Sequence, residues 1–214
     1  MKAKAVSIIG GTDGPTSVFI AGRSSKRKPL RERIRQSIYR HRRRRMAKKI
    51  DVNPHTLEEV AVYAKKKYHA KEVSKTSKRY TEQYASAKEA LIVMHKPELL
   101  GGLAKITRPD VFDETAAQEL YRQIQLRCEM AASVPDCEMP MDFHIYEIKT
   151  EDGRMEMDID FKWDIFGMSY SGNKKAMKKL EKISRELHLY YGVSEEDIRK
   201  ETKRYSSLLT VLSS

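Results

Sequence analysis

The fold class is decided by one stretch in the second half of the chain, FHIYEIKTEDGRMEMDIDFKW at residues 143–163. Two strand-like runs, 143–149 and 155–163, flank Thr150-Glu151-Asp152-Gly153, a turn sequence with glycine where a positive φ is favoured. Apolar and polar residues alternate along the second run, which predicts a hairpin with one buried face and one water-facing face. We expect Met155, Met157, Ile159, Phe161 and Trp163 in the core, and Glu156, Asp158, Asp160, Lys162 and Asp164 in water.

Helical patterns predominate on both sides of this hairpin. Apolar residues at helical spacing predict helices over about 30–49, 57–68, 79–95, 113–132, 172–190 and 195–209. The sequence Thr56-Leu57-Glu58-Glu59 is a capping-box signature, Asp113 is the expected cap of the fourth helix, and Ser194 with Asp197 caps the last. In the fourth helix we expect Ala117, Leu120, Tyr121, Ile124 and Cys128 to face inward.

The expected fold is therefore α+β, mainly helical, with a small antiparallel hairpin at about 142–164 and an N-terminal strand at about 5–9. The composition, with 40% hydrophobic and 34% charged residues, is that of a soluble globular protein. No apolar run approaches the ~20 residues of a transmembrane helix, and no secretory signal pattern is evident. With only two cysteines, Cys128 and Cys137, a reduced cytoplasmic setting is expected.

Charge is distributed very unevenly along the sequence. Residues 23–49 hold fourteen Lys and Arg against one acid, Glu32, whereas the rest of the chain holds 28 basic and 29 acidic residues. This contrast predicts three parts: a strand, Gly-rich loop and helix start at 1–22, a basic arm at 23–50, and a nearly neutral helical and α+β body at 51–214.

The basic arm is the strongest physical indication of function. Guanidinium groups pair with phosphates, and the release of condensed counterions then favours binding of nucleic acid or another polyanion. A plain solvated helix, docking of the arm on the acidic face of 155–164, and binding to an anionic membrane surface are the alternatives. The candidate contact residues are Arg31, Arg35, Arg40, Arg42, Arg43, Arg44, Arg45, Lys48 and Lys49.

A second candidate site is the Gly-rich loop near the N-terminus. A strand followed by such a loop and a helix start, with Pro15 at the first helical position, directs backbone N–H groups toward an anion. The same loop is also consistent with a structural turn in which Asp13 only caps the helix. The candidate ligand-binding residues are Gly10, Gly11, Thr12, Asp13, Gly14, Thr16 and Ser17.

The segment Ile8-Ile9-Gly10-Gly11-Thr12-Asp13-Gly14-Pro15-Thr16-Ser17-Val18-Phe19 resembles the IGGADGPT-type motif of the β subunit of sodium-ion-translocating decarboxylases. In that family the aspartate of the motif is implicated in sodium coupling, and Asp13 matches it. The resemblance covers about 16 of the 214 residues, and the family's subunit is a polytopic membrane protein. It implies a sodium ion as a candidate ligand of the loop and a decarboxylase pump as a candidate partner.

No catalytic set is recognisable in the sequence. The six histidines are scattered without ligand spacing, and no motif pairs Cys128 or Cys137 with His144 as nucleophile and base. The acidic residues at alternate positions of 155–164 are typical of the wet side of a strand rather than of a metal site. The sequence predicts no particular cofactor and no oligomeric state.

The first hypothesis is accordingly a non-catalytic protein that binds nucleic acid or another polyanion through the arm. The alternative is binding of a small anion, a nucleotide or a sodium ion at the loop 10–17, with or without catalysis. A third hypothesis makes the chain an accessory protein of a sodium-translocating decarboxylase.

Overall fold

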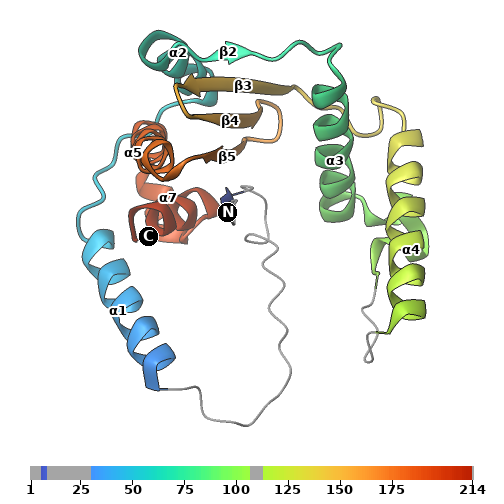
Figure 1. Ribbon diagram of the computed structural model, residues 1–214, viewed down its shortest axis with the longest axis horizontal. Coiled ribbons are helices and arrows are strands. Elements are labelled where there is room, and N and C mark those ends of the chain that lie inside the picture. The colour runs from blue at the N-terminus through green and yellow to red at the C-terminus, as the bar shows by residue number, and fades with distance from the viewer. Residues whose placement is uncertain (1–5, 9–29, 107–112, 214) are drawn as a thin grey trace. The chain divides into compact units, whose positions relative to one another are not determined.

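The computed structural model describes residues 6–8, 30–106 and 113–213 (Figure 1). The helices of this part of the chain are α1 (Leu30–Ala47), α2 (Leu57–Tyr68), α3 (Lys78–His95), the 3-10 helix η1 (Pro97–Ala104), α4 (Glu114–Ser133), α5 (Lys174–Tyr191), α6 (Glu195–Lys200) and α7 (Lys203–Ser213). The strands are β1 (Val6–Ile8), β2 (Lys71–Glu72), β3 (Phe143–Thr150), β4 (Gly153–Asp160) and β5 (Ile165–Gly172). The expected α+β class, mainly helical with a small sheet, is confirmed.

The strands form one sheet in the order β1-β5-β4-β3-β2. Strands β3, β4 and β5 follow one another through short turns, and β1 pairs antiparallel with β5, with Ser7 opposite Ser169. The hairpin and the N-terminal strand are thus confirmed, whereas β5 was not expected. Its sequence, IFGMSYSG, is rich in glycine and serine, which have little strand preference, so pairing with both neighbours determines its conformation.

The two faces of β4 differ from the expected pattern. Met155, Met157 and Ile159 are fully buried as expected, but Glu156 and Asp160 are only 8% and 1% exposed. The prediction of a water-facing row is therefore wrong at Glu156 and Asp160, whereas Lys162 and Asp164 are exposed as expected. Alternation distinguished the two faces of β4, but it could not show that residues on the second face would also be covered by the fold.

Strand β4 also ends earlier than its pattern suggested. The Oδ1 atom of Asp160 accepts hydrogen bonds from the backbone N–H groups of Lys162 and Trp163, both at 3.0 Å, which fixes a turn directly after the strand. Apolar and polar residues alternate as far as Trp163, beyond the end of the strand. Alternation of side chains does not show where the hydrogen bonding between strands stops, so the strand was predicted too long.

The helix boundaries agree well with the expected ones, and several predicted caps are present. Thr56 accepts from the backbone N–H of Glu59 at 3.3 Å while Glu59 accepts from that of Thr56 at 2.8 Å, which is the complete capping box. Asp113 accepts from Ala116 N at 2.8 Å. The expected helix 195–209 is instead two helices, because Glu201 adopts a left-handed conformation, φ 47°, that ends α6.

The expected apolar face of helix α4 is less buried than its pattern suggested. Tyr121, Ile124 and Cys128 are exposed, so their expected burial is wrong. The side of α4 that approaches α3 carries Arg127, whose Nε donates to Glu89 Oε1 at 2.6 Å. Arg127 and Glu89 form a partly buried ion pair between the two helices, and a pattern of apolar residues does not predict such a polar contact.

The chain forms two compact units, each with its own core. One comprises Met1–Lys71, Tyr146–Ile159 and Asp164–Ser214, and α5 is a central part of its core with Leu180 and Leu187 fully buried. The other comprises Glu72–Ile145 and Asp160–Trp163, where Tyr80 and Phe143 pack together with Ile145. Within the described ranges, no helix combines the length and the apolar character that crossing a bilayer requires.

Candidate polyanion-binding site

Helix α1 carries the predicted arginines, with Lys48 and Lys49 directly after it, and is anchored at its C-terminal end. Met46, Ala47 and the following Ile50 pack against a cluster of Val193, Tyr205, Leu208 and Leu209, most of it on α7. Arg43, half-buried, donates from Nη1 to Thr210 Oγ1 of α7 at 3.4 Å. The helix that carries the charge is therefore held on a folded surface rather than attached only through its ends.

The N-terminal half of α1 is much less covered. Leu30, Ile34 and Ile38 are 70%, 52% and 56% exposed, whereas Met46 and Ile50, further along the same series of apolar residues at helical spacing, are packed. All predicted polyanion contacts except Arg43 are exposed, and none of the 18 residues of α1 is fully buried. These exposed residues are Arg31, Arg35, Arg40, Arg42, Arg44, Arg45, Lys48 and Lys49.

The packing also decides one alternative for the arm. The alternative in which the basic arm docks on the acidic residues of β4 is wrong, because α1 packs against α7 and because Glu156 and Asp160 are buried. Helix α1 itself holds eight arginines and a single acid, Glu32. Most of its positive charge therefore remains at the surface.

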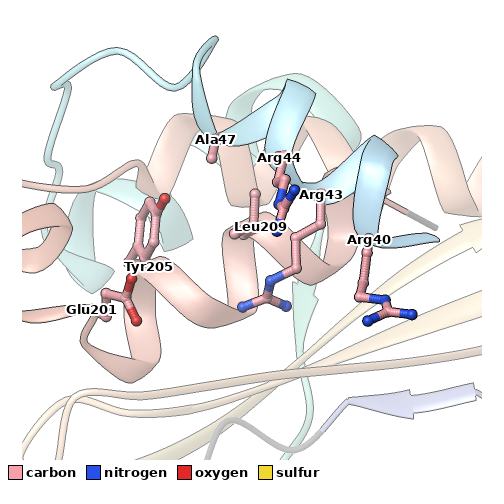
Figure 2. Close-up of a pocket in the computed structure, with 7 residues that line it drawn as sticks. All are labelled: Arg40, Arg43, Arg44, Ala47, Glu201, Tyr205 and Leu209. Atoms are coloured by element: carbon pink, nitrogen blue, oxygen red, sulfur yellow. The ribbon is translucent and has the colours of Figure 1, made fainter. Parts of the chain in front are cut away.

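A pocket of about 300 Å³ lies where α1 meets α7. It is lined by Arg40, Arg43, Arg44 and Ala47 from α1, by Glu201 after α6, and by Tyr205 and Leu209 from α7. Figure 2 shows Arg40 at one end of this group and Glu201 beside Tyr205 at the other. The pocket thus combines guanidinium groups, an apolar wall and one carboxylate.

Glu201 is the only acidic residue among those lining the pocket. In the described part of the chain its carboxylate makes no ion pair, so its oxygens remain acceptors for a ligand. Its position is fixed by the backbone, because the N–H of Glu201 bonds to the carbonyl of Ile198 at 3.4 Å at the end of α6. An anionic group would accordingly be attracted to the arginine end and repelled from the Glu201 end.

The second predicted site, Gly10, Gly11, Thr12, Asp13, Gly14, Thr16 and Ser17, lies outside the described residues. Neither the anion-binding loop nor the sodium ligand implied by the family resemblance is tested by the structure, and both stay predictions. Within the described residues, no three His, Cys, Asp or Glu side chains are grouped as metal ligands.

Cys128 and His144, which were considered as a nucleophile and a base, both contact neighbouring carboxylates. Cys128 donates its thiol to Glu89 at 2.9 Å, and desolvation together with this carboxylate raises the pKa of the thiol to about 11. His144 contacts Glu72 through Nδ1 at 2.6 Å and Asp142 through Nε2 at 3.0 Å. Both ring nitrogens of His144 thus face carboxylates, and the thiol of Cys128 is poorly suited to act as a thiolate nucleophile.

Comparisons of the chain with protein-family models, curated proteins and solved structures found no match. The functional argument therefore rests on the residues and geometry of the chain itself.

The sequence identified the arginines of the pocket but not the residues that lie across from them. Glu201, Tyr205 and Leu209 are more than 150 residues away along the chain from Arg44. Tyr205 and Leu209 have helical spacing, which predicts only that they belong to a final helix. No local signal in the sequence could have placed them opposite α1, because the contact depends on how the two helices pack.

Proposed function

We propose that the chain binds nucleic acid or another polyanion through α1. The observation that carries the proposal is the concentration of eight arginines, against one glutamate, on a single 18-residue helix. Cations condensed on the phosphates are released when the arginines replace them, and this release would supply most of the binding free energy. Because the binding groups are arginines, they also offer paired donors that match phosphate oxygens.

The arrangement along the helix supports an extended anionic partner. An α-helix of this length is about 27 Å long, enough to meet several successive phosphates. At about 100° per residue, Arg31, Arg35 and Arg42 lie within roughly 40° of one another around the helix axis. They form a stripe about 120–160° around the helix axis from Ala47, which lines the pocket with α7, whereas Met46, which packs on the α7 cluster, lies about 20–60° from the stripe.

Anchoring of the helix adds to this argument. A free arm would lose backbone freedom on binding, at a cost of about 1–2 kcal/mol for each residue that becomes ordered. Helix α1 is already folded, and Met46 and Ile50 hold its C-terminal end on the cluster that includes Leu208 and Leu209. A larger share of the electrostatic attraction is then available for affinity.

The proposal is tested by removing charge without changing the fold. We expect Arg31, Arg35, Arg42 and Arg45 replaced together by Gln to weaken binding of a labelled single-stranded oligonucleotide at least ten-fold near 0.1 M salt. Gln has nearly the helix preference of Arg, so α1 should persist. Fluorescence anisotropy measures the affinity, and circular dichroism verifies the helix content.

A matched control removes the same charge elsewhere on the same unit. Lys174, Lys175, Lys178 and Lys179 are exposed on α5, and their replacement by Gln should weaken binding much less than the α1 variant. An equal loss in the two variants would contradict the assignment to α1, since it would show that only net charge matters.

Anionic vesicles distinguish a membrane surface from a nucleic acid as the polyanion. Leu30, Ile34 and Ile38 expose apolar surface beside the arginines, as a helix at a lipid interface does. If Ile34→Ser with Ile38→Ser abolished vesicle binding while no oligonucleotide bound the original chain, the lipid surface would be the partner. We expect instead that oligonucleotide binding exists and survives this pair of substitutions.

A further inference from the structure

The pocket between α1 and α7 has properties that the general attraction of phosphates to α1 does not use. Its volume of about 300 Å³ is at the lower end of the range for small-molecule sites, ~300–1,000 Å³. It can therefore admit a single flat ring system with part of its attached sugar and phosphate. A base that is paired and stacked within a duplex could not enter it without being extruded.

The walls of the pocket suggest how such a group would lie. Tyr205, Leu209 and Ala47 line it with apolar atoms, and because Tyr205 and Leu209 are only 9% and 4% exposed, a ring would contact their exposed edges. Arg40, Arg43 and Arg44 come from the α1 side and offer donors to a phosphate. The two features are adjacent in one cavity, as a ligand that is apolar at one end and anionic at the other requires.

Glu201 supplies the feature that discriminates between ligands. Its carboxylate can only accept hydrogen bonds, and it lies at the end of the group away from Arg40 (Figure 2). Cytosine and adenine carry an exocyclic amino group that donates to such an acceptor, and guanine carries one on another edge. Thymine and uracil have a carbonyl oxygen at the corresponding position and offer the carboxylate only their ring N–H. A carbonyl oxygen facing this carboxylate would be repelled.

We infer that this pocket binds one nucleotide unit with an amino-bearing base, placing its phosphate at the arginines and its amino group at Glu201. The inference rests on the proposed function and adds a base preference to it. Single-stranded nucleic acid can deliver such a unit, because its bases are free to turn outward. A free mononucleotide has the same chemistry, so the test includes both sources.

The test compares labelled oligodeoxyadenylate, oligodeoxycytidylate and oligothymidylate of equal length at one salt concentration. The original chain should bind the first two about ten-fold more tightly than the third, as expected for one charge-assisted hydrogen bond. Glu201→Gln should reduce this ratio to about one while retaining binding to all three. The side chain keeps its size, so a change in the ratio reports the loss of the carboxylate rather than of packing.

Glu195→Gln is the matched control, because Glu195 is an exposed acid on α6 and does not line the pocket. It should leave the ratio unchanged. Adenosine monophosphate added as competitor distinguishes the two sources: displacement of oligodeoxyadenylate in the original chain but not in Glu201→Gln would show that a free nucleotide suffices. Competition only by oligonucleotides would show that the pocket needs the strand.

Failure of this inference can be separated from failure of the proposed function. Salt-dependent binding of all three oligonucleotides with equal affinity, or a preference that Glu201→Gln leaves intact, would overturn the pocket assignment and leave α1 as a binding surface. No binding of any oligonucleotide would contradict both.

Discussion

His188 is a buried histidine in a setting that keeps it neutral. It is only 3% exposed on α5, and its Nδ1–H donates to the carbonyl of Ser184 at 2.9 Å. Burial lowers its pKa from 6.5 to about 4. Between these values the unfolded chain binds a proton at this residue more readily than the folded chain, so stability falls as the pH is lowered through the window.

Because of His188, we expect the free energy of unfolding to be about 2 kcal/mol lower at pH 5 than at pH 7. His188→Gln should remove that part of the pH dependence, as measured by urea unfolding at the two pH values. His41→Gln, on the exposed surface of α1, is the control and should keep it. Equal pH dependence in the original chain and in His188→Gln would contradict the account.

Lys88 is a buried cation whose partners belong to the same unit. Its side chain is 6% exposed, and its Nζ donates to Val134 O at 2.6 Å and to Asp136 Oδ1 at 2.7 Å. Asp136 also accepts from the hydroxyl of Tyr84 at 3.2 Å. The carboxylate is thus the only charged partner of a desolvated ammonium group in the described part of the chain.

Asp136→Asn should lower the free energy of unfolding by about 1–2 kcal/mol, because it leaves the buried charge of Lys88 without its counter-charge. Glu138→Gln is a suitable comparison, since Glu138 is half-exposed and 3.8 Å from Lys96, and it should cost less than about 0.5 kcal/mol. Chemical denaturation of both variants at pH 7 measures the difference. Similar losses would show that burial of Lys88 does not matter.

At the scale of the elements, Gly192 fixes the end of α5 against another segment. It has φ 59°, and a Cβ there would lie 1.9 Å from the carbonyl oxygen of Asn53. Residues on either side join the same segments, with Asn53 N donating to Val193 O at 3.1 Å and His55 N to Tyr191 O at 3.0 Å. The missing side chain of Gly192 allows this close approach.

Gly192→Ala should therefore reduce stability by about 3 kcal/mol or more, from left-handed strain together with the backbone clash. Gly102→Ala is the control, because a Cβ at Gly102 would meet nothing within 4 Å. Thermal unfolding monitored by circular dichroism compares the two. If Gly192→Ala were as stable as Gly102→Ala, the packing of Asn53 against the end of α5 would be wrong.

What the sequence could predict at this scale depended on local interactions. Thr56, Glu59 and Asp113 act on neighbouring backbone groups, so the starts of α2 and α4 followed from the sequence. The contacts of α4 with α3, such as the Arg127–Glu89 ion pair, did not follow, because they join residues far apart in the sequence. The course of β5 was missed because it is set by pairing with its neighbours.

At the scale of the whole molecule, the sequence predicted where the positive charge lies along the chain, but not which elements pack against it. Composition alone placed the basic residues in 23–49, since charge needs no knowledge of packing. The docking of α1 on α7 and the pocket with Glu201 and Tyr205 arise from contacts across most of the chain's length. The proposed electrostatic binding therefore follows from the sequence, whereas the inferred base preference follows only from the fold.

The central claim is that anchored arginines on α1 bind a polyanion by neutralising its phosphates. It is tested most directly by the slope of the logarithm of the association constant against the logarithm of salt concentration, for single-stranded oligonucleotide and the full chain. With four or more phosphates neutralised, we expect a slope of roughly −3 or steeper, and a clearly shallower one after Arg31, Arg35, Arg42 and Arg45 are replaced by Gln. A slope near zero, or one that these substitutions leave unchanged, would contradict the account.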